Sequence, residues 1–134
     1  MRHVICDKMA ALEKEISLEK GDFYLFALFR REDAADRWDL VVASPWLEAD
    51  EQQGLNYLAD KVRAALTEEE LLSLSKIVVL EADNPVVDAV RKSVQDTRHG
   101  RVELENQDFA GVQVAHACIS TSTAPATMVR ESGR

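Results

Sequence analysis

The sequence predicts an α+β domain, in which helices pack on a mainly antiparallel sheet of five strands. Apolar residues recur at helical spacing in some segments, while others are short, apolar and rich in β-branched or aromatic residues. The segments run in the order helix, two strands, helix, short helix, strand, helix, two strands. Two pairs of adjacent strands separated by helices are typical of the α+β class.

The length and composition are those of one globular domain. The chain has 134 residues, 46% of them apolar and 30% charged. From Ser120 onward the sequence has no apolar periodicity. We therefore expect a single domain over residues 1–119 and a flexible tail over residues 120–134.

The first predicted element is a helix that ends near Gly21. Its apolar face is formed by Ile5, Met9, Leu12 and Ile16. The charged residues between them are expected to turn mainly outward: Lys8, Glu13, Lys14 and Glu15.

A central hairpin is predicted next. Residues 23–29 are apolar at every position, which indicates a strand covered on both faces, or covered on one face and paired with another chain on the other. Residues 38–44 form the next strand, and the short charged connection between the two favours an antiparallel pair.

The middle of the chain alternates helices with one strand. An amphipathic helix begins between Leu47 and Glu51, and a short helix capped by Thr67 follows it. Residues 76–80 form a strand, which could pair in parallel because helices precede and follow it. Asn84 and Pro85 begin a helix that is expected to end at His99-Gly100.

Two more strands, residues 102–105 and 112–119, complete the sheet. With helices on one face, the other sheet face is left for pairing, so we expect a homodimer. The residues expected to be buried together in one sheet–helix core are Phe23, Leu25, Phe29, Leu40, Val42, Val79 and Val114.

The two cysteines, Cys6 and Cys118, form no Cys-x-x-Cys pair and have no metal-site spacing. We expect two free, reduced and mostly buried thiols in a cytoplasmic protein. The charged N-terminus does not have the pattern of a signal peptide, and the longest apolar stretch is far too short to span a membrane.

The charge distribution argues against nucleic-acid and membrane partners. Asp and Glu number 24 against 16 Lys and Arg, so the net charge is −8. Residues 48–70 hold seven acids and two basic residues. This stretch either is a solvated face or binds a basic partner protein through residues such as Glu51, Glu68 and Glu69.

Arginine and tryptophan residues mark a candidate ligand site. Arg30 and Arg31 end the first strand of the hairpin and Trp38 begins the second, so Arg30 and Trp38 should lie at one end, with Trp46 at the other. Arg beside Trp can hold an anion or a planar ligand. The favoured interpretations are a surface cation–π contact and, for Trp46, helix packing.

His116 and Cys118 should lie on one side of the last strand, where they could present two metal ligands. Zinc would need a third or fourth ligand, for which Asp108 across the turn is a candidate. A buried, hydrogen-bonded histidine is the favoured interpretation, so no metal is predicted. No phosphate loop, dinucleotide fingerprint or nucleophile elbow occurs, and no cofactor is predicted.

Residues 37–46 (RWDLVVASPW) and 71–80 (LLSLSKIVVL) resemble segments of a set of small bacterial proteins. The resemblance covers about residues 5–119, and some of these proteins are described as antitoxin components. It implies no catalytic residues. We expect a non-enzymatic binding or regulatory domain that acts through protein–protein contacts, with an antitoxin-like role as one version. The alternative is a small-ligand-binding protein or an enzyme that uses the Arg30/Trp38 or His116 region.

Overall fold

A computed structural model describes residues 4–32 and 37–123. Within these ranges the elements follow the order α1 (Val4–Lys20), β1 (Leu25–Arg31), β2 (Trp38–Ala43), α2 (Pro45–Ala49), α3 (Glu51–Ala65), α4 (Glu68–Leu72), β3 (Leu74–Val79), α5 (Pro85–Val94), β4 (Val102–Phe109) and β5 (Val112–Ser122). The predicted α+β class is confirmed. None of the helices in the described ranges combines the length and apolar character that a bilayer crossing requires.

The five strands form one mixed sheet in the order β3-β2-β1-β5-β4. Strand β1 pairs antiparallel with both β2 and β5, and β4 pairs antiparallel with β5, but β3 runs parallel to β2. The prediction of a mainly antiparallel sheet is therefore corrected to a mixed one. The parallel pair arises because α2, α3 and α4 carry the chain back to the end of the sheet at which β2 begins, so β3 runs in the same direction as β2.

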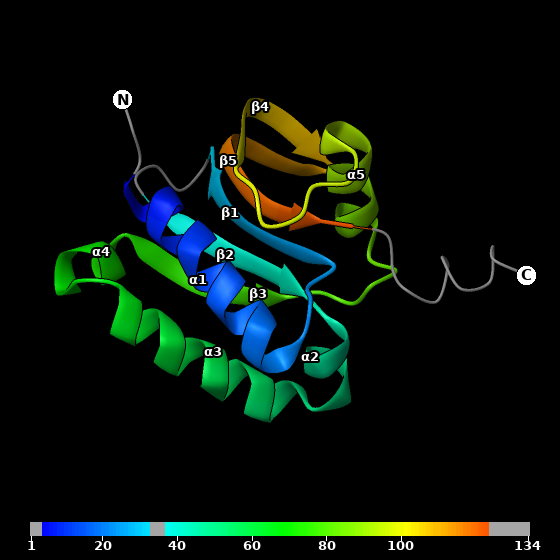
Figure 1. The fold of residues 1–134 in the computed structure, drawn as a ribbon. Helices are drawn as coiled ribbons and strands as arrows, with labels where there is room; N and C mark the ends of the chain where they lie inside the picture. Colours follow the sequence, from blue (N-terminus) through cyan, green and yellow to red (C-terminus); the bar gives the residue numbers. More distant parts are fainter. Residues whose placement is uncertain (1–3, 33–36, 124–134) are drawn as a thin grey trace, which may run out of the picture.

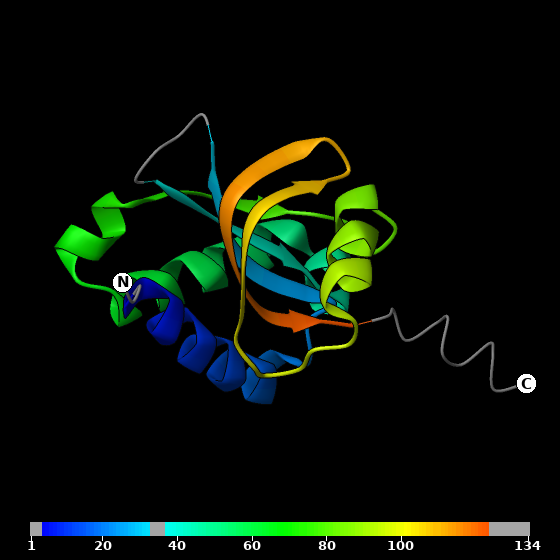
Figure 2. The ribbon, with the colours of Figure 1, turned by 90° about the horizontal axis from the view of Figure 1, so that it is seen from above.

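Helices cover both faces of the sheet (Figures 1 and 2). Helices α1 and α3 lie on one face, and α5 packs on the opposite face beside β4 and β5. Strand β1 is central, as its apolar sequence predicts, and both of its faces are covered. The second face is thus not left bare, which removes the structural reason for expecting a homodimer.

The sheet separates two apolar clusters, so the prediction of one common core is wrong. Phe23, Leu40 and Val42 lie in the cluster under α1 and α3. The opposite cluster, next to α5, contains three other predicted core residues: Leu25, Phe29 and Val114. Val79 is only partly buried against the first cluster. Alternate residues of a strand face opposite sides, so a strand buried on both faces supplies two cores.

Several predicted helix ends are confirmed. The Thr67 hydroxyl accepts a hydrogen bond from the Glu70 backbone N–H, while the Glu70 carboxylate accepts one from the Thr67 N–H. Asn84 caps α5 by accepting from the Val86 N–H. Gly21 follows α1 with a φ of 110°, a conformation that favours glycine.

Two predicted boundaries differ from the structure, and one lies within its expected range. The helix expected to begin between Leu47 and Glu51 begins at Glu51, where Asp50 caps it, and a separate short helix, α2, capped by Ser44, precedes it. Helix α5 ends at Val94, before Gln95, whose φ is 57°, rather than at His99-Gly100. Strand β5 continues to Ser122, so the predicted tail does not begin at Ser120. The rest of that tail, residues 124–134, lies outside the described residues.

Candidate functional site

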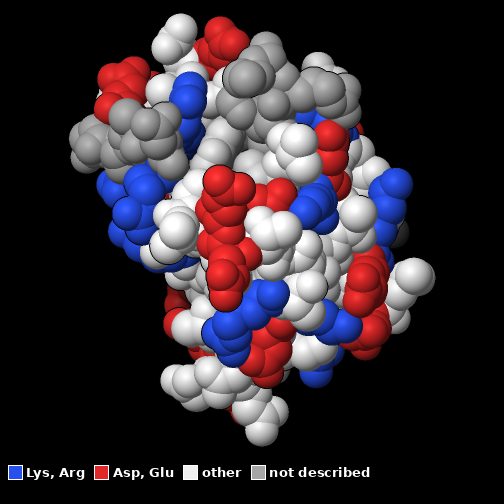
Figure 3. Space-filling view, turned by 90° about the vertical axis from the view of Figure 1, so that its left-hand side faces the viewer, with Lys and Arg blue, Asp and Glu red and all other residues white. Residues whose placement is uncertain are grey.

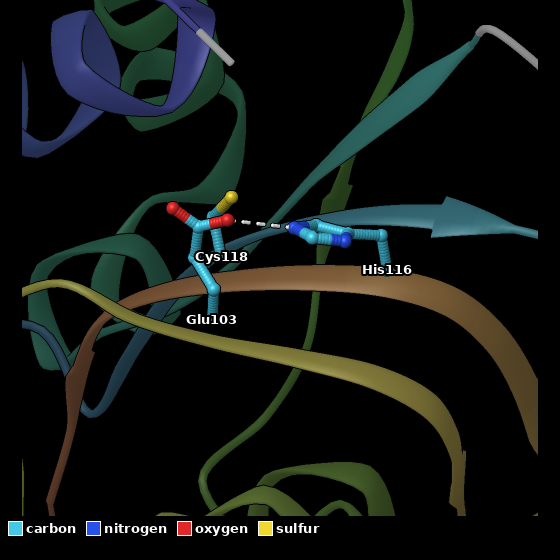
Figure 4. A group of neighbouring side chains, drawn as sticks. All are labelled: Glu103, His116 and Cys118. Carbon is cyan, nitrogen blue, oxygen red and sulfur yellow. Dashed lines mark hydrogen bonds and ion pairs between the residues drawn. The ribbon is translucent and has the colours of Figure 1, made fainter. Parts of the chain in front are cut away.

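Four side chains from three elements meet near the start of α1. Cys6 comes from the first turn of α1, Glu103 from β4, and His116 and Cys118 from β5. Glu103 is the register partner of Cys118 across the β4–β5 ladder. Residues two apart on a strand share a face, so His116 lies diagonally across from Glu103. Figure 4 shows the carboxylate, the imidazole and the sulfur directed toward one another.

Cys6 and Cys118 form a disulfide, and the prediction of two free thiols is therefore wrong. The bond joins α1 to β5 across a sequence separation of 112 residues. Both cysteines are buried, as predicted, with exposed fractions of 2% and 5%. The cysteines are distant in sequence, and only the packing of α1 on the sheet brings them together.

His116 is buried and hydrogen-bonded, which confirms the favoured interpretation of that residue. Its Nε2 atom lies 2.9 Å from Glu103 Oε1, and its Nδ1 atom lies 3.9 Å from Glu105 Oε2. Arg101 donates to Glu103 Oε2 and also to Asp7. Each carboxylate oxygen of Glu103 therefore has a different donor.

The pKa of Glu103 reflects these contacts. Partial burial acts to raise the pKa, but the hydrogen bonds from His116 and Arg101 outweigh that effect and hold the pKa below its ordinary value of 4.5. The Glu103 side chain is 34% exposed. A carboxylate is thus held in its charged form at the solvent side of the cluster.

Arg30 and Trp38 border the same cluster. The Arg30 guanidinium lies 5.7 Å from the centre of the Trp38 ring, which confirms the predicted cation–π contact. The Trp38 ring also meets the His116 ring edge to face, with centroids 5.8 Å apart. The structure therefore brings together three residues that the sequence left in two separate candidate sites.

Arg31 and Trp46 lie elsewhere. Arg31 faces the opposite side of the sheet, where its Nε atom is 3.2 Å from Asp39 Oδ2. Trp46 lies at the other end of the β1–β2 hairpin and packs edge to face against Phe23 and Tyr57. Its indole Nε1 donates to the Gly21 carbonyl oxygen at 3.3 Å. The packing interpretation of Trp46 is confirmed.

A second polar cluster surrounds Glu13, which the sequence predicted to turn outward. Glu13 is instead completely buried. Its carboxylate oxygens lie 2.9 and 3.0 Å from His99 Nδ1, and they accept hydrogen bonds from Thr121 Oγ1 at 2.8 Å and Ser17 Oγ at 3.0 Å. The burial of Glu13 is thus accompanied by partners on α1, β5 and the segment before β4.

The predicted acidic face is divided in two by the structure. Glu51 lines a hollow of about 480 Å³ at the carboxyl ends of β2 and β3, together with three other acids, Glu48, Glu81 and Asp83. Glu68 and Glu69 are in the first turn of α4, beyond the other end of α3. Helix α3 has 15 residues, which is about 22 Å of helix.

Figure 3 shows the side of the molecule that carries α4, and there acidic and basic side chains are interspersed. Lys8, for example, binds Glu70 at 2.8 Å. The Glu68 and Glu69 end is therefore not part of a surface of one sign, whereas no Lys or Arg is among the residues that line the hollow near Glu51.

Among the described residues, one group has ligand atoms close enough for a metal ion: Glu103, His116 and Cys118. Each offers one atom, and these atoms lie within 4.8 Å of one another. Asp108, the ligand considered from the sequence, instead binds the Gly111 N–H and the Gln113 side chain at the β4–β5 turn.

Sequence reasoning missed Cys6 as the partner of Cys118 and Glu103 as the partner of His116, and it missed the Glu13–His99 pair. For Cys6 and Glu13, the sequence did contain one signal, which is their helical spacing. Cys6 and Glu13 recur with Met9 and Ile16 at i, i+3, i+7 and i+10, which is a second helical row beside the apolar one. Glu103 alternates with apolar residues like any exposed strand residue, so nothing in the sequence distinguished it.

Comparisons with models of protein families, with curated proteins and with solved structures found no match for this chain.

Proposed function

We propose that the protein is a regulatory domain whose state is set by the thiol–disulfide chemistry of Cys6 and Cys118. The observation that carries the proposal is the covalent bond between the first helix and the last strand, beside a buried histidine and a charged carboxylate. The proposed cytoplasmic location fits a reversible bond, because cytosolic disulfides are mostly transient and redox-sensing.

The position of Cys6 supports exchange chemistry. It lies in the first turn of α1, a helix of 17 residues, where backbone N–H groups favour a negative thiolate. A thiolate is the form that attacks a disulfide and that oxidants attack. The first turn of a helix also opens more readily than its middle, which gives a reductant access to buried sulfur.

Reduction would remove the covalent bond between α1 and β5 and lower the stability of the fold. Loop-closure entropy for a separation of 112 residues corresponds to about 5 kcal/mol of stability. A domain of this size is stable by only about 5–15 kcal/mol. The redox state therefore controls a large share of the free energy of unfolding, through the bond that ties α1 to β5.

The test equilibrates the native protein in glutathione buffers of different ratios, alkylates free thiols and counts them by mass spectrometry. We expect a transition within the range of cellular thiol buffers, about −180 to −320 mV. Hydrogen exchange should rise in α1 on reduction, while α5, which carries no cysteine, serves as the internal control. A bond that stays oxidised throughout this range, or a reduced protein with unchanged exchange in α1, would contradict the proposal.

A second candidate function is the binding of a basic protein partner, for which an antitoxin-like role is one version. It is supported by the hollow of about 480 Å³, whose lining brings carboxylates from α2, α3 and the β3–α5 connection together. Acidic surfaces of this kind accelerate association with basic partners, and salt weakens the effect.

A labelled oligo-arginine peptide is a suitable probe for this second function, measured by fluorescence anisotropy at low and high salt. Replacing Glu51 and Glu81 with Gln should weaken binding more than replacing Glu68 and Glu69 with Gln, although both variants lose two charges. Equal losses would mean that only the net charge matters. Binding that does not respond to salt would refute the electrostatic argument.

A further inference from the structure

The cluster at Cys6 holds more than a disulfide, because the groups around the two sulfur atoms form a set of metal ligands. We propose that the reduced protein binds one zinc ion through Cys6, Cys118, His116 and Glu103, and that oxidation of the two cysteines to the disulfide releases the ion. This inference rests on the proposed thiol–disulfide exchange and adds a ligand to it.

The donor set matches zinc. Zinc in proteins is most often four-coordinate and tetrahedral, with cysteine sulfur, histidine nitrogen and carboxylate oxygen as ligands. Sulfur and imidazole ligands disfavour magnesium and calcium, which take oxygen ligands. Two thiolates, one imidazole and one carboxylate complete a four-ligand shell from the chain's own residues.

The distances allow the shell to close. The ligand atoms of Glu103, His116 and Cys118 lie within 4.8 Å of one another, and the disulfide holds the Cys6 sulfur beside that of Cys118. Ligand atoms of a tetrahedral zinc site are about 3.3–3.8 Å apart, given bond lengths of about 2.0–2.3 Å. When the disulfide is reduced, the two sulfur atoms separate to about this spacing, and the other two ligands must move inward by an ångström or so.

The surroundings already orient the ligands. Glu103 Oε1 faces the imidazole, while Oε2 is held by Arg101, so one oxygen points toward the cluster and the other is fixed outside it. With Nε2 toward the metal, Nδ1 of His116 faces Glu105, the kind of carboxylate that commonly positions a ligating histidine. The Trp38 ring lies edge-on to the imidazole and restricts its rotation.

The site has an entrance and a largely balanced charge. Glu103 is 34% exposed, so one ligand lies at the surface, while Cys6, Cys118 and His116 are buried behind it. Two thiolates and a carboxylate carry three negative charges; Zn²⁺ offsets two of them, and the Arg101 guanidinium, which Glu103 shares with Asp7, offsets part of the third. The buried ligands would exclude water from all but the Glu103 side.

The chemistry balances in both directions. A dithiol supplies two electrons and two protons to the disulfide and becomes a disulfide itself; a phosphine supplies the two electrons and becomes a phosphine oxide, with the oxygen and the two protons coming from water. The two thiols lose those protons when they bind Zn²⁺. In reverse, a peroxide takes two electrons from the two zinc-bound thiolates and, with two protons, becomes two water molecules, while the sulfur–sulfur bond forms and Zn²⁺ leaves.

The experiment reduces the full chain with a phosphine under anaerobic conditions and titrates it with Co²⁺ and then Zn²⁺. We expect one ion per chain, the intense visible absorption of tetrahedral cobalt, sulfur-to-cobalt charge-transfer bands, and loss of both when zinc displaces cobalt. Adding peroxide should release one zinc ion per disulfide formed, measured with a chromophoric chelator. The oxidised protein should bind neither metal in this way.

Variants that keep the disulfide make the test independent of folding defects. His116→Gln and Glu103→Gln should each weaken zinc affinity by more than about 10- to 100-fold, the range seen even for residues one contact removed from a zinc ion. His99→Gln and Asp108→Asn are matched controls outside the cluster and should bind zinc like the unsubstituted chain. Far-UV circular dichroism of the oxidised forms checks that all four variants fold.

Three outcomes would overturn the inference: no stoichiometric binding by the reduced chain, cobalt spectra without sulfur bands, or equal affinity in the His116 and control variants. Failure of the proposed function is separately visible. If the disulfide cannot be reduced in the folded protein, the regulatory proposal fails. If it is reduced but no ion binds, only the zinc site is refuted.

Discussion

Removal of the Glu13 carboxylate is expected to destabilise the protein more than any other single change to a charged residue of α1. Glu13 is completely buried, and its oxygen atoms contact His99, Thr121 and Ser17. In the Glu13→Ala variant these three polar side chains lose their shared hydrogen-bond partner at once. The contacts join α1 to β5 and to the segment before β4, so the loss affects tertiary packing and not only the helix.

The magnitude follows from the hydrogen bonds that are lost. A hydrogen bond typically contributes about 0.5–1.5 kcal/mol, so three contribute about 1.5–4.5 kcal/mol. Leaving the completely buried Thr121 hydroxyl without its acceptor adds a desolvation penalty of about 1–3 kcal/mol. We therefore expect the free energy of unfolding to fall by about 3–5 kcal/mol in Glu13→Ala.

Urea unfolding of oxidised protein measures this difference. Glu15→Ala is the matched control on the same helix, since the Glu15 side chain is 56% exposed and surface pairs such as Glu15–Lys61 contribute little to stability. A double-mutant cycle with His99→Gln should show coupling between positions 13 and 99. A loss below about 1 kcal/mol in Glu13→Ala, with an unchanged denaturant slope, would refute the reasoning.

Four further expectations concern stability and association. Leu25→Ala should cost about 2–5 kcal/mol, because Leu25 is completely buried in the cluster next to α5, and urea unfolding with a loss under about 1 kcal/mol would contradict this. Thr67→Ala should cost about 1 kcal/mol through the lost cap of α4, and an unchanged unfolding midpoint would argue against the cap. Hydrogen bonds from Lys8 and from the Thr67 backbone hold the pKa of Glu70 below its ordinary value of 4.5. The stability that these contacts supply should therefore be present above about pH 4.5 and lost as the pH falls through the lowered pKa. Glu70→Gln should remove that part of the pH dependence of unfolding. Sedimentation at high micromolar concentration should show a monomer, because helices cover both faces of the sheet, and a homodimer that salt does not dissociate would mean that enough apolar surface remains for pairing.

Local signals in the sequence determined most of the elements. The Thr67–Glu70 capping box, the Asn84-Pro85 start of α5 and the apolar run near Phe26 each act within a few residues of chain. Such signals depend on backbone hydrogen bonds and side-chain alternation, which are properties of neighbouring residues. They were therefore readable without knowledge of the fold.

The sequence was less informative about pairing and faces. The parallel β2–β3 pair depends on where α2, α3 and α4 return the chain, and the two separate cores depend on α5 lying on the side of the sheet opposite α1. Helix placement is decided by the fit of whole apolar surfaces. The fit depends on residues from many parts of the chain, so no short stretch of sequence predicts it.

The candidate site illustrates the same division. The sequence alone placed His116 beside Cys118, and Arg30 at the same hairpin end as Trp38, because strand alternation and hairpin geometry are local. Only the tertiary structure joined those pairs and added Cys6 and Glu103. Cys6 and Cys118 are 112 residues apart in sequence, and their meeting depends on the docking of α1 across β5. The hydrophobic effect that drives this docking is non-directional, so it can bring together polar and sulfur groups whose sequence spacing gives no sign of their contact.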